Sequence, residues 1–178
     1  PGAPLGGAAR LSPLTPRPLP AETKEMNALG VQDHKHEAES HVQQLAAAVI
    51  TVSDTRTEAT DESGRLLREL IEGAGHRVAG YRIVPDEIGA IRHAVVDMAQ
   101  AADFVVLTGG TGMTPRDVTI EACRPLFTKE LEGFGELFRM LSFQEVGSAA
   151  VMSRAAAGAM DRVMVFCLPG SKGAVCLA

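Results

Sequence analysis

Residues 102–117 read ADFVVLTGGTGMTPRD, and the predicted architecture follows from this run. Its apolar part, Phe104–Leu107, is rich in strand-forming residues and too short for a buried helix. Three glycines in four positions come directly after it: Gly109, Gly110 and Gly112. Such a loop lets the backbone approach a ligand, because no Cβ stands in the way. Successive exposed N–H groups in the loop would form an anion-binding concavity.

The residues after the glycine loop predict the start of a helix. Thr114 and Asp117 would open it, and its N-terminus would add a positive field at any phosphate bound there. Common phosphate motifs do not fit, because no Lys follows Gly112 and Pro115 stands where the dinucleotide fingerprint has its third glycine. A tight strand-to-helix turn without a ligand is the alternative that these residues leave open.

The composition describes one soluble domain. An apolar fraction of 46% suffices for a core, while no run approaches the roughly 18 apolar residues of a membrane span. The net charge of −5, without a cluster of Lys or Arg, argues against a nucleic-acid partner. Cys123, Cys167 and Cys176 lack CxxC spacing, which favours reduced thiols over a disulfide framework or a zinc site. We therefore expect a cytoplasmic protein, and the N-terminus lacks the apolar core of a signal peptide.

Two regions are predicted along the chain. Residues 1–44 are expected to form a disordered, Pro-rich and polar tail, since six of the first twenty residues are prolines. His34, His36 and His41 are expected as exposed tail residues without a metal. The folded domain is expected to occupy residues 45–178.

Strand and helix patterns alternate in the first part of this domain. The apolar run 46–52 is typical of a strand covered on both faces. N-cap residues at 60–63 precede helical spacing of leucines and Ile71, and Gly73 or Gly75 can end that helix. A strand at 77–84 and a helix at 88–102 follow. Three strand–loop–helix units in succession predict an α/β fold with parallel strands.

The second part contains weaker signals. A stripe of Phe and Leu residues at 134–141 predicts a helix with one side in the core. Met140 and Phe143 widen the apolar side of this helix, so it could also form a subunit contact. Residues 153–162 suggest a short strand with a turn around Gly158 and Asp161. A last strand at 163–168 runs into a second glycine loop at 169–173, and residues 174–178 look like the start of a helix.

Several polar residues follow the ends of predicted strands. Because ligands bind outside the carboxyl ends of parallel strands, we expect these residues on one edge of the sheet. They are hydroxyls (Ser53, Thr111, Thr114, Ser171), cations (Arg56, Arg116, Lys172) and carboxylates (Asp86, Asp117).

This set of side chains suits a polyphosphate. Backbone donors and cations would bind it, and the two carboxylates would repel it unless a divalent cation lay between them. Asp86 and Asp117 are therefore candidate Mg²⁺ ligands for phosphoryl or nucleotidyl transfer. The alternative for each aspartate is a helix N-cap or first-turn position.

Six motifs in the same order resemble the molybdopterin adenylyltransferase (MoaB/MogA) family. They are VSDTR (52–56), DESG (61–64), VPDE (84–87), LTGGTG (107–112), PRDVT (115–119) and LPGS (168–171). GFGE (133–136), RMLS (139–142), Ser153-Arg154 and Gly158 are similar to its MoaB branch. The resemblance covers about residue 45 to the end.

The resemblance implies a three-layer α/β/α sandwich with a mostly parallel sheet, assembled as a trimer or a hexamer. It also implies a step of molybdenum cofactor biosynthesis with Mg²⁺ as cofactor and with ATP and molybdopterin as substrates. In this step molybdopterin is adenylylated and pyrophosphate is released. Other molybdenum-cofactor enzymes would be possible partners, and the family's terminal helix would be cut short here.

Site residues carried over by position comprise two catalytic aspartates, Asp86 and Asp117, and a set of binding positions. The binding positions are Ser53, Gly109, Gly110, Thr111, Gly112, Thr114, Pro169, Gly170, Ser171 and Lys172. Arg116 or Lys172 would assist as a cation.

Three other functions stay open at this point. Some MoaB-branch members lack the aspartate of the VPDE motif and are thought not to catalyse, so a non-catalytic molybdopterin-binding trimer is the main alternative. This chain keeps Asp86, which favours activity. A scaffold role, and nucleotide hydrolysis as in the related CinA fold, are the others.

Overall fold

The computed structural model describes residues 44–178, so nearly all of the predicted tail, with its three histidines, lies outside the described residues. Its six strands form one sheet in the order β2-β1-β3-β6-β5-β4. They are β1 (Ala46–Val52), β2 (Arg77–Val84), β3 (Phe104–Thr108), β4 (Lys129–Glu130), β5 (Ala156–Met160) and β6 (Val163–Leu168). The first four in that order are parallel, and β5 runs antiparallel to both of its neighbours. The predicted mostly parallel sheet is confirmed.

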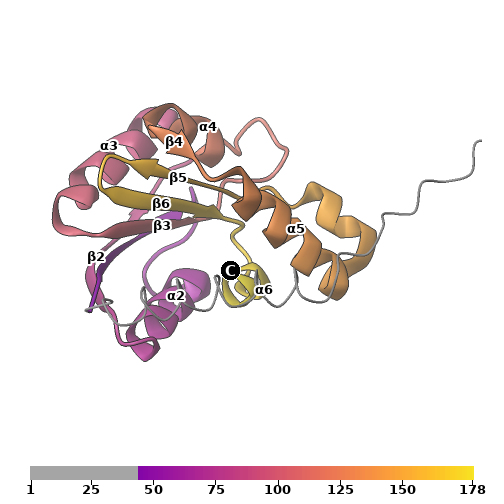
Figure 1. The fold of residues 1–178 in the computed structure, drawn as a ribbon, viewed down its shortest axis with the longest axis horizontal. Helices are drawn as coiled ribbons and strands as arrows, with labels where there is room; N and C mark the ends of the chain where they lie inside the picture. Colours follow the sequence, from indigo (N-terminus) through magenta and orange to yellow (C-terminus); the bar gives the residue numbers. More distant parts are fainter. Residues whose placement is uncertain (1–43) are drawn as a thin grey trace, which may run out of the picture. The chain divides into compact units, whose positions relative to one another are not determined.

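Helices cover both faces of the sheet, which confirms the predicted three layers (Figure 1). The helices are α2 (Glu62–Gly73), α3 (Ile88–Met98), α4 (Thr119–Cys123), α5 (Glu132–Val146) and α6 (Lys172–Leu177). α3 and α4 pack on one face, and α2 and α6 pack on the other together with the beginning of α5. None of the helices in residues 44–178 has the length and apolar character that a membrane crossing requires.

Strand β1 shows why this sheet needs two helical layers. All seven of its residues are buried, and alternate side chains enter opposite cores. Ile50 packs in the core with Ile91 and Val95 of α3. Val49 points the other way and packs in the core that Leu67 of α2 lines. The continuous apolar run follows from burial on both faces.

Two helix boundaries differ from the prediction. The helix expected over 88–102 ends at Met98 and continues only as a 3₁₀ turn, Ala99–Ala101. The helix expected to open at Thr114 begins at Thr119. The carboxylate of Asp117 accepts hydrogen bonds from the backbone N–H of Thr114 at 2.8 Å and its hydroxyl at 2.6 Å. These bonds hold a separate turn ahead of the helix.

The C-terminal part also corrects the prediction. Asp161 lies in the β5–β6 turn with a φ of 55°, as expected, but Gly158 lies within β5, opposite Glu130 and Val165. A Cβ on Gly158 would stand 2.4 Å from the ring of Phe127, so the glycine serves packing. Helix α6 begins at Lys172, so the second loop comprises only residues 169–171.

Helix α5 has a buried side and an exposed apolar side. Phe138 is buried, and the ring of Phe134 lies 5.5 Å from that of Phe166, so these two residues belong to the core. The exposed side continues into the 3₁₀ helix η3 (Gly147–Met152), and we call it the α5 face. It consists of Leu137, Met140, Phe143, Val146, Val151 and Met152, each at least 52% exposed.

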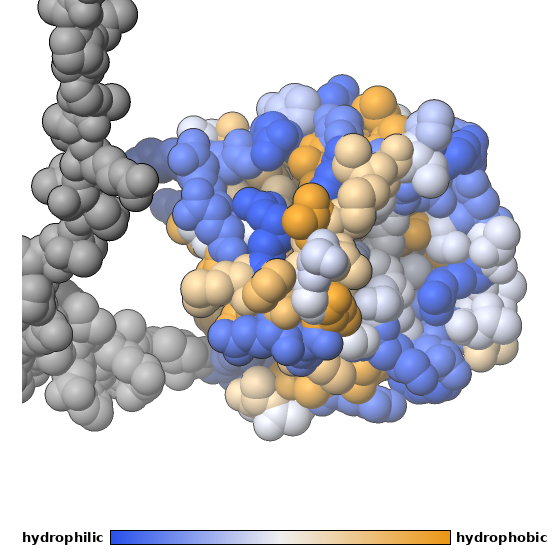
Figure 2. Space-filling model, turned by 90° about the vertical axis from the view of Figure 1, so that its right-hand side faces the viewer, coloured by the Kyte–Doolittle hydropathy of each residue, from blue (hydrophilic) through white to orange (hydrophobic). Residues whose placement is uncertain are grey.

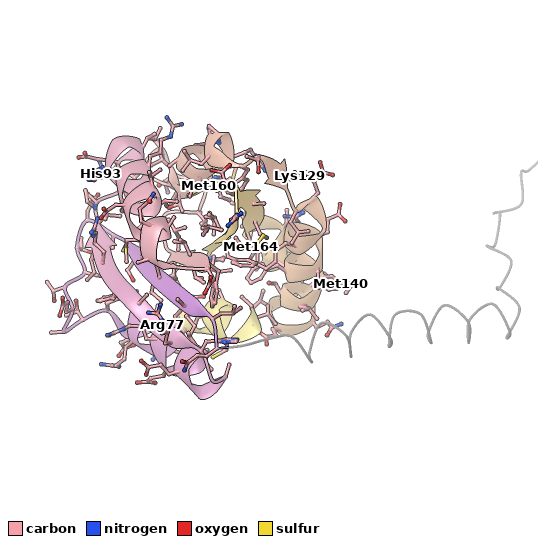
Figure 3. The ribbon with its side chains drawn as sticks, turned by 60° about the vertical axis from the view of Figure 1, so that its left-hand side comes forward. Arg77, His93, Lys129, Met140, Met160 and Met164 are labelled. Atoms are coloured by element: carbon pink, nitrogen blue, oxygen red, sulfur yellow. The ribbon has the colours of Figure 1, made fainter. Side chains whose placement is uncertain are left out.

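The views agree with this division of α5. Figure 2, which looks onto the side that carries α5 and η3, shows apolar side chains among polar ones. Figure 3 shows Met140 on the outer side of the helix, away from the sheet. The prediction that the stripe packs in the core therefore holds for Phe134 and Phe138, while the residues of the α5 face point outward.

A buried carboxylate ties β1, β2 and α2 together. Asp61 is 1% exposed and accepts hydrogen bonds from Thr51 Oγ1 at 2.5 Å and Tyr81 Oη at 2.6 Å. It also caps α2 by accepting from the N–H of Gly64 at 3.0 Å. Burial opposes its ionisation, but these bonds outweigh burial and hold the pKa of Asp61 below its ordinary value.

We predict that Asp61→Asn lowers the free energy of unfolding by about 2–3 kcal/mol at pH 7, because hydrogen bonds to a charged acceptor are lost. A lowered pKa in the folded state means that this contribution is complete above the unfolded pKa of about 3.9 and is lost as the pH falls through the folded pKa. Urea unfolding at several pH values should therefore show the gap between wild type and variant closing below about pH 4. A gap that is constant with pH would contradict an ionised Asp61.

Asp97→Asn is the matched control, since Asp97 is exposed and pairs with Arg82 at the surface. It should change stability by less than about 0.5 kcal/mol.

Candidate functional site

The predicted edge of the sheet is a topological switch point. Strands β1 and β3 are neighbours, and the helices that follow them, α2 and α4, lie on opposite faces. The loops after the two strands meet between these helices. In open α/β sheets this crevice is where ligands bind.

The glycine loop lies directly against the end of β1. Gly109 and Gly110 have φ values of +101° and +61°, which L side chains rarely adopt. A Cβ on Gly109 would stand 2.3 Å from the carbonyl oxygen of Val52, a backbone atom that has no room to move away. Glycine at this position is therefore required by the close approach of two backbones.

The side chains of both predicted catalytic aspartates pack against the glycine loop. A Cβ on Gly110 would stand 2.7 Å from Asp86 Oδ1, and one on Gly112 would stand 2.8 Å from Asp117 Oδ2. Neither aspartate caps a helix, because Glu87 and Val118 hold the N-cap positions of α3 and α4, without a side-chain bond. The helix-cap alternative is therefore wrong for both aspartates.

The two carboxylates have different electrostatic surroundings. Burial and the nearby carboxylate of Asp54 raise the pKa of Asp86 above its ordinary value. The hydrogen bonds from Thr114, with help from the N–H of Gly112 and the charge of Arg154, lower the pKa of Asp117. Within residues 44–178 no Lys or Arg pairs with Asp86. A bound cation would relieve the repulsion around it.

Hydrogen bonds hold the glycine loop and the β6 loop as one rigid unit. Thr119 Oγ1 donates to the carbonyl of Gly109 at 2.8 Å, and Thr108 Oγ1 donates to that of Pro169 at 3.1 Å. Ser63 Oγ donates to the carbonyl of Gly170 at 2.8 Å and joins α2 to this unit. The amides of Gly110 and Thr111 donate no hydrogen bond within the described residues.

A pocket of about 420 Å³ opens between these two loops. Among the predicted binding residues, it is lined by Gly109, Gly110, Thr111, Gly112, Pro169, Gly170 and Ser171, together with Asp117. Asp86 lies beside Gly110 but does not line this pocket, and neither do Ser53, Thr114 and Lys172.

The remaining predicted side chains are engaged in other contacts. Ser53 Oγ accepts from the backbone N–H groups of Thr55 and Arg56 and shapes its own loop. Arg116 pairs with Asp54, across the gap between the β1 and β3 loops. Lys172 Nζ pairs with Glu62 at 2.9 Å. Arg56 Nη1 lies 3.6 Å from Asp61 Oδ1. None of the three predicted cations lines the pocket.

Three lining residues were missed as site residues: Met152, Ser153 and Arg154. They lie at the end of η3, ahead of β5, and so do not follow the end of a predicted strand. The only sequence signal for them is the Ser153-Arg154 motif of the resemblance. The structure brings Arg154 close enough to lower the pKa of Asp117.

The donor set fits Mg²⁺ only together with a phosphate ligand. Residues 44–178 contain no group of three or more His, Cys, Asp or Glu side chains placed to hold a metal ion. Mg²⁺ in nucleotide sites usually takes one or two carboxylates and completes its shell with water and substrate phosphates. Asp86 and Asp117, which pack against Gly110 and Gly112, are the carboxylates that would serve such a site.

The fold and the site define a doubly wound α/β protein with a pocket between the loops that follow β3 and β6. The family model described as a probable molybdopterin binding domain matches residues 48–178. Molybdenum cofactor biosynthesis protein B of Bacillus subtilis is 55% identical over 153 residues, which cover 84% of this chain and 88% of that protein.

Solved structures agree with the sequence comparison. A crystal structure of molybdenum cofactor biosynthesis protein B matches with a TM-score of 0.74 at 51% identity, covering 76% of this chain and 86% of the other. The tungsten cofactor synthesizing protein MoaB from Pyrococcus furiosus matches with a TM-score of 0.69 at 44% identity, covering 76% and 88%. The chain belongs to the MoaB/MogA family of molybdenum cofactor biosynthesis proteins.

We predict that Gly109→Ala lowers the free energy of unfolding by at least about 2 kcal/mol, because it combines a left-handed φ with a clash against a backbone oxygen. Chemical denaturation followed by circular dichroism would measure the loss. Gly89→Ala is the control, since Gly89 lies in α3 and a Cβ there would meet nothing within 4 Å. It should raise stability by about 0.5–1 kcal/mol. Equal effects of the two substitutions would refute the close approach of the glycine loop to β1.

Proposed function

We propose that this protein adenylylates molybdopterin, with Mg²⁺-ATP as the second substrate and pyrophosphate as the second product. The observation that carries the proposal is the pair of carboxylates, Asp86 and Asp117, packed on the two sides of one glycine loop at the switch point. Neither aspartate caps a helix, and their pKa values are shifted in opposite directions. Separated pKa values of neighbouring carboxylates are a feature of functional sites.

Each part of the site has a role in this reaction. The free amides of Gly110 and Thr111 bind phosphate oxygens, and the fixed loops hold both substrates in line. An oxygen of the molybdopterin phosphate attacks the α-phosphorus of ATP, and the bond from that phosphorus to the β-phosphate bridging oxygen breaks. Asp86 and Asp117 would hold Mg²⁺, which supplies charge neutralisation on the phosphates and on the leaving pyrophosphate.

A non-catalytic molybdopterin-binding protein is the second candidate. It is favoured by one observation: Asp86 does not line the 420 Å³ pocket, so a ligand could occupy that pocket without reaching this carboxylate. The two candidates differ in whether Asp86 is needed for turnover.

The proposal includes an assembly and a location. The α5 face, with side chains such as Phe143 at 59% and Val151 at 78% exposure, would form the contact of a homotrimer or hexamer. Other molybdenum-cofactor enzymes would be further partners. Cys123, Cys167 and Cys176 are free thiols, which fits a cytoplasmic location.

We predict that release of pyrophosphate from Mg²⁺-ATP requires molybdopterin and falls at least about a hundredfold in Asp86→Asn and in Asp117→Asn, because a positioned group that stabilises transition-state charge is lost. Both variants should keep the wild-type circular dichroism spectrum. A pyrophosphate-release assay with and without molybdopterin would measure this, and Asp97→Asn, at the far end of α3, should keep wild-type turnover.

The same assay separates the alternatives. Tight molybdopterin binding without pyrophosphate release would make the protein a carrier. Nucleotide cleavage that is independent of molybdopterin would indicate hydrolysis. An unchanged rate in Asp117→Asn would remove that residue from the mechanism.

We further predict that Phe143→Asp shifts the protein toward the monomer by placing a charge in the centre of the α5 face. Light scattering after size exclusion would give the mass. Val96→Asp is the control, because Val96 is 45% exposed on α3, outside the α5 face, and should leave the mass unchanged. A wild-type monomer would rule out the assembly.

A further inference from the structure

Arg154 is the one Lys or Arg among the described residues that line the 420 Å³ pocket. It lies between η3 and β5, and its side chain is 28% exposed. The glycine loop and Asp117 line the same pocket. The guanidinium of Arg154 therefore borders the space in which a ligand would lie.

Part of this guanidinium is held by the protein and part is not. Arg154 Nη2 donates to Glu121 Oε1 at 2.7 Å and Oε2 at 2.9 Å. Arg154 Nε is buried and has no hydrogen-bond partner within the described residues. A buried N–H without an acceptor is costly, so the guanidinium is incompletely satisfied by the protein. Nε is enclosed and Nη2 is bonded to Glu121, so Nη1, which donates no hydrogen bond within the described residues, is the nitrogen left for a ligand.

The chemistry of the pocket identifies the class of that acceptor. The amides of Gly110 and Thr111 also donate no hydrogen bond within the described residues, so the pocket is lined by backbone donors as well as by a guanidinium. Guanidinium groups bind phosphate through several N–H groups at once, which a point charge does not. Arg116 and Lys172 pair with Asp54 and Glu62 and lie outside the lining.

We propose that Arg154 binds a phosphate group of the substrate in this pocket, and that Glu121 is the positioning residue that orients it. This inference rests on the proposed function, since ATP and molybdopterin are the two sources of phosphate that it supplies. It assigns the phosphate-binding cation to Arg154 in place of Arg116 or Lys172.

A purely structural role for Arg154 makes a different prediction. In that case the Arg154–Glu121 pair would only fasten the η3–β5 junction to α4. Removing either partner would then lower thermal stability to a similar extent and leave ligand affinity unchanged. Affinity, and not stability alone, separates the two roles.

The test is calorimetric titration of Mg²⁺-ATP, of pyrophosphate and of molybdopterin into wild type, Arg154→Gln, Arg154→Lys and Glu121→Gln. We expect Arg154→Gln to weaken binding of at least one phosphate ligand by about tenfold or more, as for a lost charge-assisted hydrogen bond. Arg154→Lys should recover part of the affinity, because it restores the charge but not the fork. Glu121→Gln should cause a smaller loss, because the guanidinium is still present.

Arg124→Gln is the matched control. Arg124 also pairs with a glutamate, Glu130, through Nε and Nη2, and it lies outside the pocket. The substitution removes the same charge and should leave all three affinities unchanged.

The titrations also identify the source of the phosphate. Loss confined to molybdopterin would assign Arg154 to the pterin phosphate, and loss confined to ATP and pyrophosphate would assign it to the nucleotide. Wild-type affinities in Arg154→Gln for all three ligands would overturn the proposal. Wild-type protein that binds these ligands but releases no pyrophosphate would refute the proposed adenylylation. The assignment of Arg154 would not be refuted by that result, because it is tested by the Kd values of the variants.

Discussion

The site depends on the absence of side chains along the glycine loop. At Gly109 the space of a Cβ is taken by the carbonyl oxygen of Val52, and at Gly110 and Gly112 by the carboxylates of Asp86 and Asp117. A side chain at any of these three glycines would therefore push the loop away from β1 or displace a carboxylate or the hydroxyl of Thr119. The loop can therefore lie close to its neighbours, with Asp117 lining the pocket and Asp86 beside Gly110.

Negative and positive side chains are separated around the glycine loop. Asp54, Asp86 and Asp117 are close enough that the first and third both contribute to the raised pKa of Asp86. Arg116 compensates Asp54, while Arg154 lines the pocket together with Asp117 and lowers the pKa of that carboxylate. A ligand that carries both phosphate and a divalent cation would satisfy both halves, because the metal would lie near the carboxylates and the phosphate near Arg154.

The pocket and the α5 face share a residue. Met152 lines the pocket and is 59% exposed as part of the α5 face, at the end of η3. A subunit that packs on this face would cover a wall of the pocket and limit the movement of Met152 and the adjoining Arg154. Assembly and ligand binding would then influence each other through η3, since burial of this wall also strengthens the local electrostatic interactions.

The sequence determined five of the six strands and the glycine loop, because burial on both faces and the lack of a Cβ leave local patterns. It missed β4, whose two residues are both exposed. It also placed Asp86 and Asp117 correctly at one edge, since parallel strands end there. Local patterns did not show that Asp117 forms a separate turn, that Gly158 makes room for Phe127, or that Arg154 enters the pocket. These three facts arise from contacts between segments that are distant in sequence or from competition among hydrogen bonds. They became visible only when the chain was folded, because a side chain's partner is set by its three-dimensional neighbours.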